Sequence, residues 1–112
     1  MRFVILMSSD DEAWAALSSA EQSRVMAAHE ACERELRAGK HFLASWRLRP
    51  ADEARSVVRE PDGSYCAKSS AELCAQLGGA YLIEVASRDD AEAWARRLRF
   101  IPGVNEVREV WE

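Results

Sequence analysis

The chain has 112 residues, of which 48% are hydrophobic and 30% are charged, as in an ordinary soluble domain. A chain of this length buries roughly 65% of the surface that it exposes when unfolded, which is enough for one hydrophobic core and too little for two, so a single domain over residues 1–112 is expected. The net charge of −4 comes from acidic and basic residues that alternate along the chain, and without a basic patch neither nucleic acid nor a membrane surface is expected as a partner.

The apolar runs and the cysteines exclude two further classes of protein. The longest apolar run, Phe3 to Met7, is far shorter than the ~20 residues of a membrane-spanning helix, and polar residues rather than a cleavage site follow it. A cytoplasmic protein is therefore expected. Cys32, Cys66 and Cys74 are odd in number and fit neither a disulfide framework nor a Cys-x-x-Cys metal site, so neither a metal site nor a bound cofactor is expected.

The N-terminal part of the chain predicts a strand followed by a long helix. Residues 2–7 form a short apolar run that is typical of a strand. After a short connector, the sequence offers two candidate capping boxes. Ser18 is followed three residues later by Glu21, and Ser19 by Gln22. The helix is expected to run to about residue 38, with His29 on its apolar stripe and with Gly39 as its C-terminal cap and point of chain reversal.

The middle of the chain predicts a half-buried strand and then a hairpin. Residues 41–48 alternate so that one side carries Phe42, Ala44, Trp46 and Leu48, and the other carries His41, Leu43, Ser45 and Arg47. Residues 54–59 and 64–67 flank a Pro-Asp-Gly turn and predict a β-hairpin beside the core.

The C-terminal part predicts a strand, a helix and a last strand. Residues 80–85 form the third core strand, and residues 87–90 have the composition of a helix N-terminus. Residues 102–103, Pro-Gly, close this helix, and residues 104–111 form the last strand. The apolar stripe of the helix consists of Ala91, Trp94, Ala95 and Leu98.

The predicted order is strand, helix, strand, strand, helix, strand, with the hairpin inserted between the second and third strands. This order is that of the α+β ferredoxin-like plait, or split βαβ fold. An antiparallel sheet with both helices on one face leaves the other face uncovered, and Trp46 and Tyr81 are expected there. Because so large an apolar face is unusual on a monomer, a homodimer is expected.

The order and spacing of several segments resemble one protein family over almost the whole chain. The segments are FVILMSSDDEAWAALS (3–18), MAAHEACERELRAGK (26–40), LGGAYLIEV (77–85), DDAEAWARRL (89–98) and VREVWE (107–112). They are similar to the YCII-related family, specifically its branch that contains the DGPF motif. The resemblance implies a dimeric α/β barrel-type assembly of the plait, and the few enzymes of this family act on small ring-derived or chlorinated acids.

The chain departs from the family pattern in two places. Residues 67–70 read Ala-Lys-Ser-Ser where the branch has Asp-Gly-Pro-Phe, so any role of that motif is in doubt. At the end of the first helix the enzymatic relatives have an acid that works with the helix histidine, whereas this chain has Arg37, Gly39 and Lys40. A ready-made His–Asp pair is therefore not visible in the sequence.

His29 and Asp10 are the candidate catalytic residues. His29 matches the helix histidine of the family, and imidazole has the side-chain pKa nearest to neutral pH, as a general base requires. Its alternative is a histidine that fills space under the sheet and makes one hydrogen bond. Asp10, with Asp11 beside it, matches an acidic position of the family and could orient His29 or hold a water, and its alternative is a cap or turn residue.

Three further residues are candidates for contact with a ligand. Arg47 could hold a carboxylate with its planar set of donors, and its alternative is an exposed strand arginine without a partner. Trp46 could floor a ligand pocket or lie in the dimer interface. Ser8, at the end of the first strand, is the third candidate.

Two functions from different classes follow from these residues and from the resemblance. In the first, a homodimer binds a small organic acid between the sheet and the first helix and hydrolyses it, or eliminates from it, with His29 as general base. In the alternative, the protein is a non-catalytic module for ligand sensing or protein interaction. Some DGPF members accompany extracytoplasmic-function sigma factors, and the missing acid and the replaced motif favour this alternative.

Overall fold

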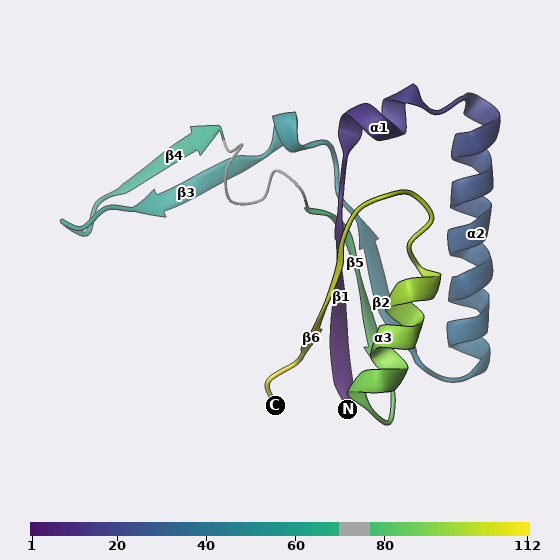
Figure 1. Cartoon of the computed structure of the whole chain (residues 1–112). Coiled ribbons are helices and arrows are strands. Elements are labelled where there is room, and N and C mark those ends of the chain that lie inside the picture. The colour runs from purple at the N-terminus through teal and green to yellow at the C-terminus, as the bar shows by residue number, and fades with distance from the viewer. Residues whose placement is uncertain (70–76) are drawn as a thin grey trace.

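A four-stranded antiparallel sheet forms the centre of the protein, and α2 and α3 lie on one face of it (Figure 1). These elements are seen in a computed structural model that describes residues 1–69 and 77–112. Ser70 and Cys74, both considered above, lie outside the described residues. In chain order the elements are β1 (Arg2–Ser8), α1 (Asp11–Ala16), α2 (Ser19–Ala38), β2 (Phe42–Arg47), a short 3-10 helix (Ala51–Glu53), β3 (Arg55–Arg59), β4 (Tyr65–Ser69), β5 (Leu77–Glu84), α3 (Arg88–Arg97) and β6 (Asn105–Glu109).

The strand order of the large sheet is β2-β5-β1-β6, and each neighbouring pair is antiparallel. The described residues thus form an α+β structure with antiparallel sheets and three α-helices. The two strands that are adjacent in the centre, β5 and β1, are far apart in sequence, as a split βαβ arrangement requires. The architecture is compatible with the predicted ferredoxin-like fold.

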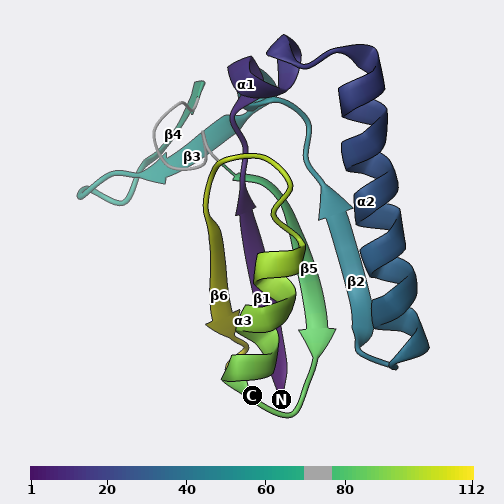
Figure 2. The same ribbon diagram turned by 45° about the vertical axis from the view of Figure 1, so that its right-hand side comes forward.

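The strands β3 and β4 pair with each other and form a separate two-stranded antiparallel sheet. Figures 1 and 2 show this pair, called here the β3–β4 arm (residues 55–69), reaching away from the large sheet. The radius of gyration is 16.0 Å, whereas a compact domain of this length has about 13 Å. The arm accounts for the extended shape.

The residues between β1 and α2 form a helix, α1, where the sequence predicts only a connector. Asp10 is its N-cap, and the Asp10 carboxylate accepts a hydrogen bond of 3.0 Å from the backbone N–H of Ala13. The capping box of the next helix is confirmed, because Ser18 Oγ accepts from the N–H of Glu21 and the Glu21 carboxylate accepts from the N–H of Ser18. These bonds satisfy N–H groups that the first turn of a helix leaves without partners.

The chain reverses after α2 at residues 39–41. Gly39 is the C-cap as predicted, but its φ is −82°, and Lys40 takes the left-handed conformation with φ of 60°. Glycine is favoured at position 39 for reasons of space, because a Cβ there would lie 2.7 Å from the imidazole ring of His41.

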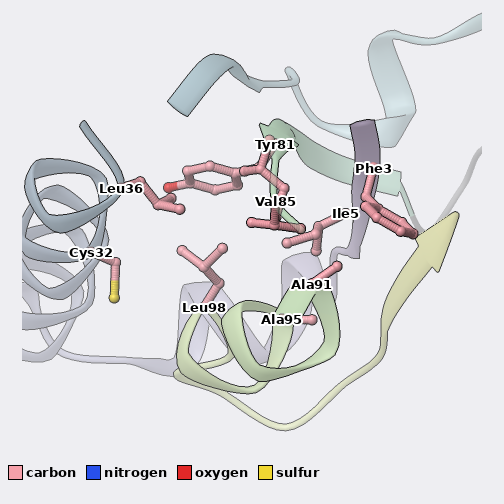
Figure 3. Packing of buried hydrophobic residues seen from close by; sticks show 10 residues of the cluster. Phe3, Ile5, Cys32, Leu36, Tyr81, Val85, Ala91, Ala95 and Leu98 are labelled. Atoms are coloured by element: carbon pink, nitrogen blue, oxygen red, sulfur yellow. The ribbon is translucent and has the colours of Figure 1, made fainter. Parts of the chain in front are cut away.

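The hydrophobic core lies between the sheet and the two helices α2 and α3 (Figure 3). The α3 stripe predicted from periodicity is confirmed, since Ala91, Ala95 and Leu98 are buried and Trp94 packs against them. The largest fully buried side chains are those of Phe3, Ile5, Leu36, Ile83 and Leu98.

The alternation predicted for β2 is wrong at its first residue. A register shift separates Phe42, which pairs with Ile83, from Ala44, which pairs with Leu82. Paired residues of neighbouring strands share a face of the sheet, so Phe42 lies on the helix face with the core, whereas Ala44 lies on the opposite face. The cause is the extra residue of a β-bulge, which reverses the alternation.

Tyr81 also lies on the other face from the one predicted. It is buried, with 8% of its surface exposed, in the core beneath α2 (Figure 3). Ser45 pairs with Tyr81 and shares that face, and Trp46 pairs with Ala80 on the uncovered face. The strand of Tyr81 begins at Leu77, three residues earlier than predicted.

Within residues 1–69 and 77–112, none of the helices combines the length and the apolar character that a membrane-spanning segment needs.

Candidate functional site

A cavity of about 640 Å³ lies between the end of β1, the helix α2, the strand β2 and the segment that follows α3. Its volume falls within the range of about 300–1,000 Å³ that is typical of small-molecule sites. The residues that line it include all five site residues predicted from the sequence, namely Ser8, Asp10, His29, Trp46 and Arg47.

His29 projects from the middle of α2 and is half-buried. Its Nδ1 lies 3.1 Å from the hydroxyl oxygen of Tyr81, and the edge of the Phe100 ring system packs against it with 4.7 Å between ring centroids. Burial lowers the pKa of His29 below its ordinary value, and the positive charges of Arg99 and Arg47 lower it further. The imidazole is therefore neutral at pH 7.

Tyr81 is the hydrogen-bond partner of His29 in the part of the chain that the structure describes, and the sequence prediction missed it. Burial raises the pKa of the Tyr81 hydroxyl to about 12, with smaller contributions from Glu33 and Cys32. The hydroxyl therefore keeps its proton at neutral pH. Tyr81 alternates with Ile83 and Val85 along one strand, and this period of two is the signal that could have placed it on the helix face.

Asp10 has the capping role that the sequence left open as its alternative. Its carboxylate is bound to the first turn of α1, although the residue also borders the cavity. Asp11 accepts a hydrogen bond of 2.8 Å from the Ser9 hydroxyl and one of 3.4 Å from the N–H of Ala51. The loop carboxylates thus stabilise the rim, and the described residues show Tyr81 rather than a carboxylate against His29.

Arg47 and Trp46 are neighbours in β2 with opposite orientations. The guanidinium of Arg47 lies over the ring of Trp14, 5.3 Å from its centroid, on the side of the cavity. The pairing of Trp46 with Ala80 places the Trp46 side chain on the uncovered face, where 53% of it is exposed. Trp46 is nevertheless among the residues that line the cavity. Its backbone lies close to β5, because a Cβ at Gly79 would lie only 2.6 Å from the Trp46 carbonyl oxygen.

Ser8 holds the segment that follows α3 to the end of β1. Its hydroxyl oxygen accepts a hydrogen bond of 2.9 Å from the N–H of Val104, and its carbonyl oxygen accepts one of 3.1 Å from Nη1 of Arg99. Ser8 therefore shapes the wall of the cavity.

Arg99 is a second residue that sequence reasoning missed. Its Nε donates to the carbonyl oxygen of Ile101 at 2.8 Å, its Nη1 donates to the side-chain oxygen of Asn105 at 3.0 Å, and its Nη2 donates to the carbonyl oxygen of Pro102 at 3.1 Å. Burial lowers the pKa of this guanidinium. These partners are gathered by the folded loop, so no spacing in the sequence indicates them.

The remaining acidic side chain beside Tyr81 has its own partners. Glu33 accepts a hydrogen bond of 3.0 Å from the Ser45 hydroxyl and lies 3.8 Å from Nη2 of Arg37. In contrast, no carboxylate of residues 1–69 and 77–112 forms an ion pair with Arg47 or Arg99. The positive charge that acts on His29 is thus not balanced by a direct ion pair there.

The part of the chain that the structure describes contains no group of three or more His, Cys, Asp or Glu side chains that could hold a metal ion.

A family model described as the YCII-related domain matches residues 1–112. No curated protein matches the chain.

Proposed function

The chain belongs to the YCII-related domain family, and from this premise we propose that it binds a small organic acid in the cavity between its sheet and α2. The observation that carries this proposal is the pair of guanidinium groups, Arg47 and Arg99, that act on His29. No carboxylate among the described residues forms an ion pair with either. The carboxylate of a ligand would supply the missing negative charge.

The lining of the cavity supports a small ligand with an apolar body. Trp14, Met26, Phe100 and Ile101 contribute apolar walls, and His29 and Arg47 are among the polar groups of the lining. A mostly apolar pocket with a few placed polar groups is the common form of a small-molecule site, in which the apolar wall supplies affinity and the polar groups fix orientation. An acid with a short apolar substituent fits this distribution.

Catalysis would require more than binding. Hydrolysis or elimination with His29 as general base needs an unprotonated ring nitrogen at the ligand, and Nδ1 already has the Tyr81 hydroxyl as its partner. We therefore propose binding of a small organic acid as the function. Catalysis is tested separately, by assaying turnover of the same acids.

We also propose that the chain belongs to the DGPF branch of the family, although residues 67–70 lack the motif. The support is the order of the Leu-Gly-Gly segment at residues 77–79 and the C-terminal Val-Trp-Glu of residues 110–112.

The test is a titration of the protein with lactate and chloroacetate that is followed by tryptophan fluorescence, since the ring of Trp14 lies beside Arg47 at the cavity. Lactamide, which has the same size as lactate and no charge, is the control ligand. Saturable changes with the acids and none with the amide are expected. Arg47→Gln should weaken acid binding roughly tenfold or more, as loss of a charged hydrogen-bond partner does.

Arg34→Gln is the matched control variant, because Arg34 lies on the exposed side of α2. The substitution removes the same charge as Arg47→Gln, but away from the cavity. It should bind the acids as the unaltered protein does. Equal binding of acid and amide, or equal weakening by the two variants, would refute the proposed site.

A further inference from the structure

The hydrogen bond between His29 and Tyr81 can be made in two ways, and they leave different atoms at the ligand. Either the tyrosine hydroxyl donates to an unprotonated Nδ1, or a protonated Nδ1 donates to the hydroxyl oxygen. A neutral imidazole carries one proton on one of its two nitrogens. In the first case Nε2 is protonated and can only donate, and in the second case Nε2 is unprotonated and can accept.

The surroundings of the hydroxyl favour the first arrangement. Tyr81 is 8% exposed, and in the described part of the chain the hydrogen-bond partner of its hydroxyl is Nδ1 of His29, at 3.1 Å. Glu33 lies near enough to act on the hydroxyl through its charge, but its hydrogen bond comes from Ser45. If Nδ1 were the donor, the buried hydroxyl proton would have no acceptor among residues 1–69 and 77–112, which is costly in the interior of a protein.

The surroundings of the imidazole keep it neutral. Charged and titratable groups line the cavity from each element around it: Asp10 and Asp11 where α1 begins, Glu30 and Glu33 from α2, Arg47 from β2 with Arg49 just after it, Tyr81 from β5, and Arg99 from the segment after α3. Arg47 and Arg99 act directly against a positive charge on the ring. The packing against Phe100 removes water that could solvate such a charge.

We propose that Tyr81 is a positioning residue that donates to Nδ1 of His29 and thereby fixes the proton of His29 on Nε2, so that His29 offers a hydrogen-bond donor to an acid and does not act as a general base. The part that concerns the acid rests on the proposed function. The part that concerns the tautomer rests on the two side chains alone.

The chain contains an internal reference for this tautomer. His41 is the other of its two histidines, and His41 Nδ1 lies 2.9 Å from the carbonyl oxygen of Glu84. A carbonyl oxygen only accepts, so Nδ1 of His41 must be protonated. The two histidines are therefore expected to be opposite tautomers in one molecule.

The experiment is long-range ¹H–¹⁵N correlation NMR of the imidazole rings in the uniformly labelled, ligand-free protein above neutral pH. His29 should show a protonated, pyrrole-type Nε2 and an unprotonated, pyridine-type Nδ1. His41 should show the reverse assignment. A protonated Nδ1 on both histidines, or a doubly protonated His29, would overturn the proposal.

Tyr81→Phe tests the cause of the tautomer, because it keeps the buried ring and removes the hydroxyl. The Nδ1 signal of His29 should lose the shift of a hydrogen-bonded acceptor, and the ring should become a mixture of tautomers. Tyr65→Phe is the matched control, since it deletes the same hydroxyl from an exposed tyrosine of the β3–β4 arm, and it should leave the His29 signals unchanged. If Tyr81→Phe fails to fold, the spectrum of the unaltered protein decides the question.

Binding of lactate separates this proposal from the proposed function. His29→Gln, whose amide keeps an N–H donor near the position of Nε2, should bind lactate within a few-fold of the unaltered protein, and His29→Leu should bind it roughly three- to tenfold more weakly. Equal loss in both variants would overturn the donor role. The predicted tautomers without lactate binding in any variant would refute the acid site and leave the positioning role of Tyr81 standing.

Discussion

The surroundings of His29 in the folded protein disfavour the charged form of its imidazole. Two guanidinium groups and partial burial disfavour its charged form, whereas the unfolded chain exposes it to water. Its pKa is consequently lower in the folded protein than in the unfolded chain. Protonation of His29 is therefore linked to unfolding.

This linkage predicts that acid destabilises the protein through His29. Below the ordinary histidine value of 6.5 the unfolded chain binds a proton that the folded protein resists, so the free energy of unfolding falls as pH decreases through this region and levels off below the folded pKa. Thermal unfolding measured at a series of pH values should show this slope. His29→Gln should reduce the slope, and His41→Gln, the control, should retain it.

An equal slope in the unaltered protein and in His29→Gln would contradict the lowered pKa of His29.

The helices show which features of the fold can be predicted from residues that are close together in the sequence. The capping box of α2 and the apolar stripe of α3 depend on side chains three or four residues apart, and both are found as predicted. The bulge in β2 depends on the register between β2 and β5, which no local pattern specifies. The same limit explains why the contacts of Tyr81 and Arg99 were not predicted. The partner of Tyr81 comes from α2, and Arg99 bonds to Ser8 of β1 as well as to its own loop.

The candidate site follows the same division. The predicted residues do line one cavity, because the ends of β1 and β2 lie beside the middle of α2 in this fold. The contacts among them are different from the ones expected: Asp10 binds its own helix, and His29 binds a tyrosine. Residue type and position along the chain were enough to predict which residues line the cavity. Which of these residues contact one another is seen only in the packed structure.

The two serines that open α2 provide a prediction for this element. Ser18 accepts from the N–H of Glu21, whereas Ser19 is the first residue of the helix and has no capping role. Ser18→Ala should lower the free energy of unfolding by about 1 kcal/mol, and Ser19→Ala should change it little. Chemical denaturation of both variants measures the difference, and equal effects would contradict the assignment of the cap.

In the part of the chain that the structure describes, α2 and α3 lie on one face of the large sheet and no helix covers the other (Figure 1). Apolar side chains of β1, β2 and β5 occupy the second face, including Val4, Leu6, Ala44, Trp46 and Leu82. An uncovered apolar face of this kind commonly marks an interaction surface. We therefore propose that two copies of the chain associate through it.

This proposal predicts that Trp46→Glu shifts the protein toward monomer, because a charge would be buried without a partner in the interface. Light scattering at several protein concentrations measures the shift. Val57→Glu, in the β3–β4 arm, is the control, since Val57 is more exposed than Trp46 and lies off the sheet face. A dimer that persists in Trp46→Glu, or a monomer in the unaltered protein, would contradict the proposal.

The separation of the β3–β4 arm from the large sheet also has a consequence for hydrogen exchange. Isolated two-stranded antiparallel pairs are only marginally stable in water, and the arm pairs with no strand of the large sheet. Its backbone amides can therefore open without any disturbance of the core. In deuterated solvent the arm should exchange early as one cooperative unit, while the amides of β1 and β5 exchange only with global unfolding.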